Sequence, residues 1–501
     1  MQMDRDLQSI QEVRDLVAKA KAAQAELAEF SQEKIDRICE AIAIEGAKNA
    51  ERLAKMASEE TGFGVWQDKI LKNILGSTLT WEAIKDIKTV GIIKDDKAKH
   101  LMEVAVPMGV VAALIPSTNP TSTVMYKSMI SIKAGNSIVI SPHPNAKNCI
   151  LETYKIVAQA AKSAGAPDGI VQCVTIPSPE GTSALLKHKD VGIILATGGE
   201  AMVRAAYSSG HPALGVGPGN GPSYIEKSAD IKEAVRRIFE SKTFDNGTIC
   251  ASEQSIVTEE CIKDQVIAEV KRQGGYFLSP EESDKLGRFI MRANGTMNPA
   301  IVGRSAKVIA EKVGLSIPEG TRILISPQTT VGKDNPYSRE KLCPILAFYV
   351  EKDWESACER CMAILHNEGV GHTMTIHSQD ESVIREFALK KPVSRLLVNT
   401  NGSLGGVGAT TGLAPALTLG CGAMGGSATS DNVGPLNLIN IKRVAYGIKE
   451  LADLRGDKPA PAPVQKPAAA EIPAAAEAKG ASMLTKEDIE RITRSILAKL
   501  Q

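Results

Sequence analysis

The sequence predicts an α/β protein built on parallel sheets. From about residue 104, short apolar runs of strand length alternate with longer segments of helical periodicity, which is typical of βαβ units. A second block with the same alternation runs from about 225 to 425 and indicates a second α/β domain. At 501 residues, the chain is long enough for each domain to bury its own core.

The elements can be placed in chain order. Residues 8–58 are predicted to be helical, because their apolar side chains recur every three or four positions. We expect the first domain to span 1–224 and the second 225–425, with 426–457 returning to the first. Strands are predicted at 110–115, 137–140, 170–176, 191–195, 255–258, 345–350, 396–399 and 437–445. A helix is predicted at 146–163, between the second and third of these strands.

Composition argues against several classes of protein. The net charge of +1, without a basic stripe, argues against nucleic acid as the main partner. No apolar run is long enough to span a membrane, and the N-terminus does not resemble a signal peptide. Nine irregularly spaced cysteines fit a reducing cytoplasm. Cys358 and Cys361 form a CxxC on a predicted helix, but no second pair completes a zinc set, so no metal site is expected.

One cysteine stands out by its local pattern. Cys250 lies in the segment Phe-Asp-Asn-Gly-Thr-Ile-Cys-Ala-Ser-Glu (244–253), after a turn that contains Gly247 and before a predicted strand. Most cysteines are small core residues, but here the backbone N–H can be presented together with the thiol. A nucleophile for acyl transfer needs this arrangement, because the N–H can stabilise the developing oxyanion.

This segment resembles the nucleophile motif of the aldehyde dehydrogenase superfamily. Residues 115–120, Ile-Pro-Ser-Thr-Asn-Pro, resemble a second motif, whose Asn contributes its amide to the oxyanion hole; by match this is Asn119. The resemblance covers about residues 8–450. It implies a Rossmann-type cofactor domain, an α/β catalytic domain that carries Cys250, and oligomerisation strands, expected at 97–106 and 437–445. A homodimer or a dimer of dimers is therefore expected.

The resemblance also implies NAD as the cofactor. Residues 196–200, Ala-Thr-Gly-Gly-Glu, place a Gly turn at a helix N-terminus, where a pyrophosphate can approach closely. His143 stands in the family's Lys-Pro element, whose Lys is missing here, and Glu340 matches the Glu that holds the nicotinamide ribose. The cofactor contacts are expected at Ile115, Pro116, Ser117, Thr118, Pro142, His143, Thr197, Gly198, Gly199, Val216, Gly217, Glu340 and Leu342.

The second substrate is expected to be the thiol of coenzyme A. Residues 215–220, Gly-Val-Gly-Pro-Gly-Asn, match the stretch in which hydrolytic members carry a Glu that activates water, and Gly215 occupies the position of that base. A thiol with a pKa of about 8.5 is partly ionised near neutrality and can attack without it. This stretch and residues 420–426 resemble the CoA-acylating branch. His372 resembles a His of that branch and can serve as the base for the thiol.

The resemblance is to propionaldehyde and acetaldehyde dehydrogenases of bacterial microcompartments. It implies oxidation of a short-chain aldehyde, with propionaldehyde favoured, to an acyl-CoA through a thioester on Cys250. A hydrolytic aldehyde dehydrogenase and a non-catalytic scaffold remain as alternatives. We expect no bifunctional aldehyde–alcohol dehydrogenase, because no second catalytic domain fits after residue 457.

The composition changes after Asp457. Residues 458–482 are rich in Ala and Pro and are predicted to form an extended linker. Residues 483–501 are predicted to form an amphipathic helix, with Ile489, Ile492 and Ile496 on one face. This helix resembles encapsulation peptides, which implies shell proteins as partners and the microcompartment lumen of the bacterial cytoplasm as the location. Docking back onto the same enzyme is the alternative.

Overall fold

The computed structural model describes residues 4–292 and 294–456. The predicted linker at 458–482 and helix at 483–501 therefore lie outside the described residues. By its internal contacts the chain divides into a unit up to Ala445 and a second unit from Tyr446, which contributes α17 (Leu451–Arg455) to the description. The first unit contains three sheets, and the prediction of an α/β fold with parallel sheets is confirmed.

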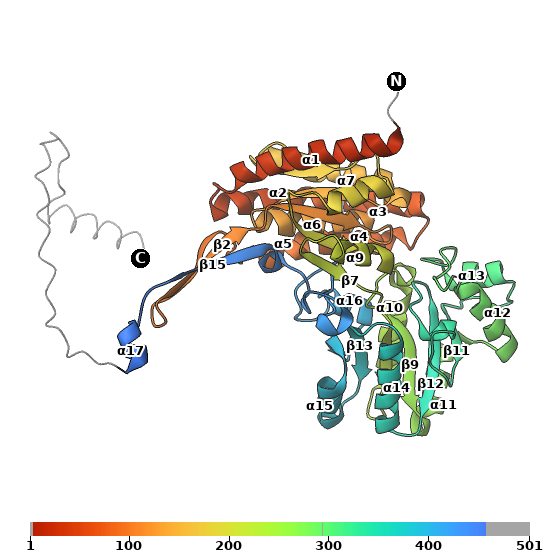
Figure 1. Cartoon of the computed structure of the whole chain (residues 1–501). Coiled ribbons are helices and arrows are strands. Elements are labelled where there is room, and N and C mark those ends of the chain that lie inside the picture. The colour runs from red at the N-terminus through yellow and green to blue at the C-terminus, as the bar shows by residue number, and fades with distance from the viewer. Residues whose placement is uncertain (1–3, 293, 457–501) are drawn as a thin grey trace, which may run out of the picture. The chain divides into compact units, whose positions relative to one another are not determined.

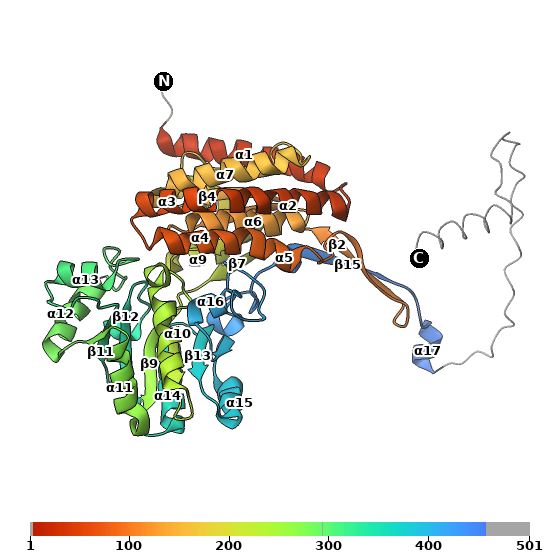
Figure 2. The ribbon, with the colours of Figure 1, turned by 180° about the vertical axis from the view of Figure 1, so that it is seen from behind.

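The first domain is a five-stranded parallel sheet in the order β5-β4-β3-β6-β7. The expected strands of this domain are present, but the one expected at 170–176 is limited to Val171–Cys173. Helices cover both faces of the sheet (Figures 1 and 2). The elements are β3 (Val110–Ile115), β4 (Ser137–Pro142), β5 (Val171–Cys173), β6 (Val191–Thr197), β7 (Ala213–Val216), α1 (Arg5–Leu27), α2 (Gln32–Lys48), α3 (Ala50–Thr61), α4 (Trp66–Ile74), α5 (Thr80–Ile84), α6 (Pro120–Lys133), α7 (Lys147–Ser163), α8 (Pro179–Leu186) and α9 (Glu200–Tyr207).

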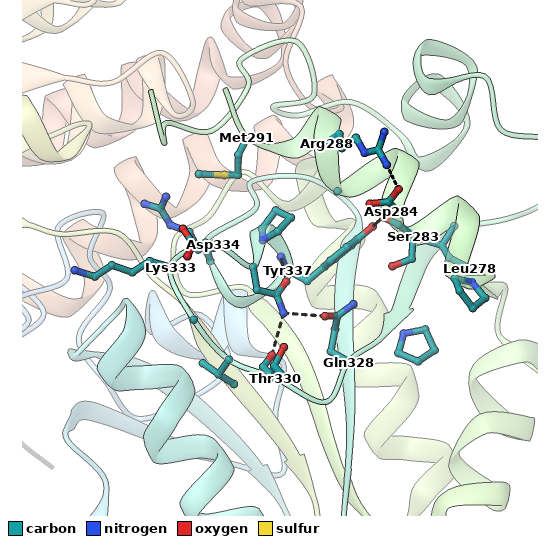
Figure 3. Close-up of a pocket in the computed structure, with 18 of the residues that line it drawn as sticks. Leu278, Ser283, Asp284, Arg288, Met291, Gln328, Thr330, Lys333, Asp334 and Tyr337 are labelled. Atoms are coloured by element: carbon teal, nitrogen blue, oxygen red, sulfur yellow. Dashed lines mark hydrogen bonds and ion pairs between the residues drawn. The ribbon is translucent and has the colours of Figure 1, made fainter. Parts of the chain in front are cut away.

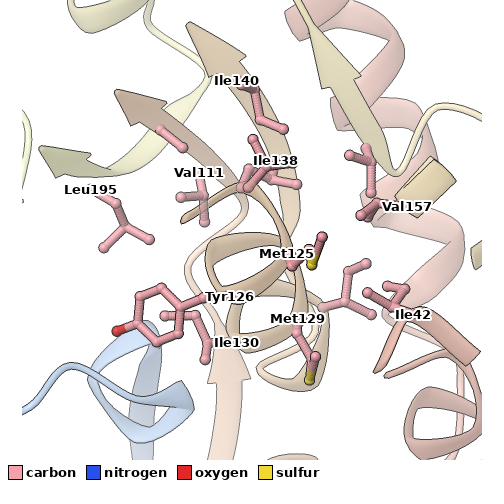
Figure 4. Close-up of a cluster of buried hydrophobic side chains, with 14 of the residues drawn as sticks. Ile42, Val111, Met125, Tyr126, Met129, Ile130, Ile138, Ile140, Val157 and Leu195 are labelled. Carbon is pink, nitrogen blue, oxygen red and sulfur yellow. The ribbon is translucent and has the colours of Figure 1, made fainter. Parts of the chain in front are cut away.

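The central strand β3 explains why its sequence is a continuous apolar run. Successive side chains of a strand point to opposite faces, and both faces are covered here. Val111 and Ala113 join one core cluster with α2, α6 and α7, whereas Val110 and Ala112 join another with Val17 of α1. Figure 4 shows the first cluster, in which Met125 and Met129 of α6 pack under the sheet.

The second domain is a seven-stranded parallel sheet in the order β10-β11-β12-β9-β8-β13-β14. Two core clusters contain most of its buried apolar residues. The elements are β8 (Gly221–Ile225), β9 (Glu253–Glu259), β10 (Gly275–Phe277), β11 (Ile323–Pro327), β12 (Ile345–Glu351), β13 (Gly371–His377), β14 (Val393–Val398), α10 (Ile231–Thr243), α11 (Lys263–Arg272), α12 (Pro280–Ile290), α13 (Ala306–Val313), α14 (Trp354–Asn367), α15 (Glu381–Lys390) and α16 (Gly402–Gly406).

The third sheet is antiparallel and consists of β1 (Gly91–Asp96), β2 (Leu101–Pro107) and β15 (Ile439–Ala445). β15 pairs with β2 along its whole length, so the two segments expected at 97–106 and 437–445 lie side by side. The expected boundary at 97 is wrong. Residues 97–100 form the turn between β1 and β2, with His100 at a φ of 51°, a conformation that suits a turn and not a strand.

Both expected domain boundaries also shift. Residue 224 falls inside β8, which pairs with β9 and β13 and so belongs to the second sheet. The return to the first domain begins well before 426, because Val407, Ala416 and Leu419 already pack in its core cluster. Among the described residues, no helix is long and apolar enough to cross a membrane.

Candidate active site

Cys250 lies in a tight turn between a single 3-10 turn (Phe244–Gly247) and β9. The N–H of Ser252 donates to the carbonyl of Ile249 at 3.0 Å, and this bond closes the turn around the cysteine. Of the nine cysteines, seven are buried, Cys250 is partly exposed and Cys261 is exposed. Cys250 therefore combines a structured turn with access for a substrate, as a nucleophile requires.

The surroundings of this thiol favour its neutral form. Although part of the residue reaches solvent, burial raises the pKa of Cys250 to about 12, and the Glu340 carboxylate adds to the effect. The guanidinium of Arg395 and the backbone N–H of Cys250 act in the opposite direction. In this state the thiol keeps its proton at neutral pH, so a bound ligand or a base has to promote its ionisation.

The segment 217–220 lies directly against the nucleophile. A Cβ atom on Gly219 would stand 1.8 Å from the carbonyl oxygen of Cys250, so only glycine fits there. The N–H of Gly219 donates to Oε1 of Glu340 at 2.8 Å. Burial raises the pKa of Glu340 to about 8, with Glu368 adding to the rise and the Gly219 N–H opposing it. The Glu340 carboxyl is thus held beside the nucleophile through a single glycine.

Asn119 precedes α6, and its side chain reaches the loop that leads to Cys250. Its amide nitrogen donates to the carbonyl of Thr248 at 3.3 Å and to the hydroxyl of Thr118 at 3.2 Å. Its amide oxygen accepts a hydrogen bond from Nζ of Lys72 at 2.6 Å. The fold therefore brings together Asn119 and the turn of Cys250, two segments that are far apart in the sequence.

Most of the predicted cofactor contacts lie at one edge of the first sheet, whereas Glu340 and Leu342 lie just before β12 of the second sheet. Ile115, Pro142, Thr197 and Val216 are the last residues of four strands of the first sheet, and Ile115 pairs with Pro142 as Thr197 does with Val216. Ligands of open parallel sheets bind outside this carboxyl edge.

The helix that starts at this edge leaves room for a phosphate. Gly198 and Gly199 are exposed, Gly199 caps α9, and a Cβ added to Gly199 would meet no atom within 4 Å. A pyrophosphate can therefore approach the backbone N–H groups there. His143 is exposed beside the edge, with its Nδ1 accepting from the N–H of Asn145. These residues fit a dinucleotide.

Gly215, which stands where hydrolytic members carry their basic Glu, has no room for a side chain. Gly215 lies in β7, and a Cβ there would stand 2.7 Å from a methyl of Val203 and 2.9 Å from the ring of Tyr207. The N–H of Gly215 donates to the Tyr207 hydroxyl at 2.9 Å, which fixes the ring against the strand. A longer side chain at 215 could not enter without displacing the tyrosine.

His372 is fully buried at the start of β13. Its Nδ1 forms a hydrogen bond with Oγ1 of Thr373 at 3.0 Å. Its Nε2 has no hydrogen-bond partner in the part of the chain that is described. Burial, with help from Arg395, lowers the pKa of His372 to about 3, so the ring is neutral and weakly basic in this state.

The structure brings together the turn of Cys250, the Asn119 amide and, through Gly219, the Glu340 carboxyl. A sequence model described as the aldehyde dehydrogenase family matches residues 6–401, well over half of the chain. The chain belongs to the aldehyde dehydrogenase family.

Two curated relatives of this aldehyde dehydrogenase place it near the CoA-dependent members. It is 45% identical over 442 residues to the bifunctional aldehyde-alcohol dehydrogenase AdhE of Escherichia coli, covering 87% of this chain and 50% of the relative. It is 40% identical over 438 residues to the succinate-semialdehyde dehydrogenase (acetylating) of Clostridium kluyveri, covering 87% and 96%. The chain thus spans about half the length of the first of these relatives.

Solved structures show the same fold. A probable aldehyde dehydrogenase from Listeria monocytogenes matches with a TM-score of 0.90 and 62% identity, covering 90% of this chain and 100% of that one. An acetylating aldehyde dehydrogenase from Geobacillus thermoglucosidasius matches with 0.88 and 52%, covering 90% and 99%. A propionaldehyde dehydrogenase from a Clostridium phytofermentans microcompartment matches with only 0.78 and 28%, covering 87% and 97%. The resemblance to acylating enzymes is therefore confirmed, but the chain is less similar to the microcompartment enzyme.

Sequence reasoning missed three charged residues of this aldehyde dehydrogenase. Lys69 and Lys72 of α4 and Asp245 form a buried ion-pair cluster behind Asn119 and the Cys250 turn. The available signal was a pair of lysines one turn apart on a helix, together with an Asp in the nucleophile motif. Neither points to the other without the fold.

Two other features lie outside the site. A cavity of about 960 Å³ in the second domain lies between α12 and residues 327–339, and Figure 3 shows Tyr337 and Gln328 among its lining. It includes Arg339, the neighbour of Glu340, but no residue assigned above to catalysis or to the cofactor. Cys358 and Cys361 are buried on α14, and no cluster among the described residues could hold a metal ion.

Proposed function

We propose that this chain oxidises a short-chain aldehyde with NAD and transfers the acyl group to coenzyme A, through a thioester on Cys250. The observation that carries this proposal is the closed position at Gly215. The nucleophile turn and the Asn119 amide are assembled, whereas Val203 and Tyr207 fill the space that a water-activating Glu would need. The names of the acetylating relatives support the same reaction.

Each of these residues has its own role in the proposed reaction. Sγ of Cys250 attacks the aldehyde carbonyl, while the amide of Asn119 and the N–H of Cys250 donate to the oxyanion. NAD, when bound at the strand ends, supplies the hydride acceptor. The C–H bond breaks as the carbonyl reforms, which leaves an acyl group on Cys250. The thiol of coenzyme A then attacks this thioester, and Cys250 departs as a thiolate. The products are acyl-CoA, NADH and one proton.

His372 is the proposed base for the incoming thiol. Its Nε2, which has no partner among the described residues, can accept a proton in the tautomer whose Nδ1–H donates to the Thr373 hydroxyl, but a pKa of about 3 makes it a poor base in the ligand-free state. The role therefore requires polar groups or water to enter with coenzyme A and raise the pKa of the ring. Glu340, whose pKa is about 8, accepts a hydrogen bond from the N–H of Gly219, the residue that packs against Cys250.

The aldehyde is proposed to be small. The word acetylating does not specify the aldehyde, because a succinate-semialdehyde dehydrogenase carries it too, so propionaldehyde stays the prediction from the sequence, with acetaldehyde next. One methylene contributes only about 1–3 kcal/mol in a pocket, so both aldehydes should be turned over. Steady-state kcat/KM for aldehydes of increasing chain length measures this preference.

The acceptor is tested by omitting coenzyme A. With aldehyde and NAD alone, we expect a burst of about one NADH per site and then slow turnover, because the thioester has no activated water to attack it. Adding coenzyme A should restore steady turnover and yield acyl-CoA. Free acid formed at an undiminished rate without coenzyme A would support the hydrolytic alternative, and absence of any aldehyde-dependent NADH would support the scaffold.

The antiparallel sheet is proposed to join subunits of a homodimer or tetramer. After its first residue, β15 is exposed throughout, and β1 is mostly exposed. An exposed strand edge is a ready site for pairing with another chain.

The segment 483–501, which lies outside the described residues, is proposed to bind microcompartment shell proteins and to carry the enzyme into the lumen. The support is its amphipathic pattern beyond an Ala/Pro-rich stretch. Deletion of 458–501 should leave activity per molecule intact and abolish co-purification with shell proteins, and Ile492→Glu should act in the same way. Shell association that persists after the deletion would exclude this role.

A further inference from the structure

Two buried lysines lie behind the oxyanion amide. Lys69 and Lys72 are one turn apart on α4 and are 2% and 3% exposed. Nζ of Lys69 donates to Oδ2 of Asp245 at 2.9 Å, and Nζ of Lys72 donates to the same oxygen. Asp68 completes the cluster, because its carboxylate accepts from the N–H of Asp245 at 2.7 Å. Burying this many charges is costly unless each is paired, so the cluster calls for an explanation.

Lys72 differs from Lys69 in what else it touches. Its Nζ donates to the amide oxygen of Asn119 at 2.6 Å and to the hydroxyl of Thr248 at 3.0 Å. Lys69 instead donates to the backbone carbonyl of Thr118 at 3.2 Å. One ammonium group therefore contacts both the amide of the oxyanion hole and the loop two residues before the nucleophile.

The chemistry of the two groups fixes the orientation of the amide. An ammonium group only donates, so it selects the oxygen of Asn119 and turns the nitrogen toward the loop before Cys250, where it donates to the carbonyl of Thr248. An oxyanion formed at Cys250 would take over this donor. A positive charge on the oxygen also polarises the amide and strengthens its N–H as a donor in a site of low dielectric constant.

The loop before Cys250 needs such support. Asp245 and Asn246 have φ values of 50° and 51°, the left-handed region that non-glycine residues rarely adopt. Oδ1 of Asp245 accepts from the N–H of Val65 at 2.7 Å, and a Cβ on Gly64 would stand 1.8 Å from that oxygen. The carboxylate is thus enclosed by the start of α4, and the ion pairs hold the strained loop in place.

We propose that Lys72 is a positioning residue that orients the Asn119 amide and the Cys250 turn for stabilisation of the oxyanion. The proposal rests on the function proposed above and extends it to a residue that does not touch the substrate. It requires the effects of Lys72 and Asn119 on catalysis to depend on each other.

A double-mutant cycle tests that dependence. The variants are Lys72→Met, Asn119→Ala and both together, with the rate of the NADH burst in the full-length enzyme as the readout. Asn119→Ala should slow the burst by about 10²–10³-fold, the usual effect of losing one oxyanion donor. Lys72→Met should slow it by roughly 10–10²-fold with little change in the KM for NAD. The double variant should be within about twofold of Asn119→Ala alone.

Lys69→Met is the matched control. It removes a lysine from the same helix and the same ion-pair cluster but leaves the Asn119 contact in place, so its effect should multiply with that of Asn119→Ala. Lys72→Arg, which keeps the charge and the donors, should recover part of the rate. If Lys72→Met fails to give a wild-type melting temperature, Lys72→Gln replaces it in the cycle.

The outcomes separate the two proposals. Multiplying effects of Lys72 and Asn119, with folded variants, would overturn the positioning role and leave the proposed function intact. A normal burst from Cys250→Ala would instead overturn the proposed function, whatever the cycle shows. An Asn119-dependent effect of Lys72, confined to the burst rate, is the supporting result.

Discussion

Cys250→Ala should abolish NADH formation from aldehyde, both in the burst and in steady turnover. The side chain provides the only proposed covalent attachment for the acyl group, so without it neither hydride transfer nor transfer to coenzyme A can proceed. Binding of NAD, followed by quenching of protein fluorescence, should stay near the wild-type value, because the predicted cofactor contacts do not include Cys250 and most of them lie at the strand ends of the first sheet.

Cys421→Ala is the matched control for this variant. Cys421 is buried in a Gly-rich loop and is only 1% exposed, so its loss should leave the burst in place. Incubation with aldehyde and NAD should add the mass of one acyl group to the wild type and to Cys421→Ala, but not to Cys250→Ala. Substantial turnover by Cys250→Ala would contradict the assignment of the nucleophile.

Gly219→Ala should reduce kcat by about 10²-fold without unfolding the protein. The added methyl would overlap the carbonyl oxygen of Cys250, 1.8 Å from the new carbon, so the turn that carries the nucleophile has to move. A displacement of about 1 Å in a reacting group is enough for a loss of this size. Burst kinetics should show that acylation, rather than release of products, has become slow.

Gly412→Ala provides the comparison for this substitution. It adds the same methyl group at a glycine where a Cβ would meet nothing within 4 Å, so the rate of acylation should be unchanged. If Gly219→Ala retained the wild-type burst rate, the close packing of segment 217–220 on the nucleophile would have no catalytic importance.

Local patterns in the sequence were sufficient for most of the fold and for the nucleophile turn. β3 could be placed because a strand buried on both faces is apolar at every position. Cys250 could be placed because its turn is specified by the neighbouring residues 244–253. β1 was missed because its sequence, Gly-Ile-Ile-Lys-Asp-Asp, is short and exposed, so it lacks an apolar pattern of its own.

The domain boundaries could not be read in the same way. The sequence of β8 contains no pattern that indicates which sheet the strand joins. Only its pairing with β9 and β13 assigns it to the second domain. In the same manner, residues 407–438 have loop character in the sequence but fill part of the core of the first domain. Membership of a sheet or core depends on contacts between distant segments, and such contacts leave no local periodicity.

The sequence by itself determined the class of fold, the family and the segments that carry the chemistry, because these depend on local periodicity and on motifs within a few residues. Only the tertiary structure decided how the segments meet. It placed Tyr207 over Gly215, left His372 buried with a low pKa, and set Lys72 against Asn119. Each of these follows from packing between elements that are far apart in the chain, where burial and charge set the chemistry of a side chain.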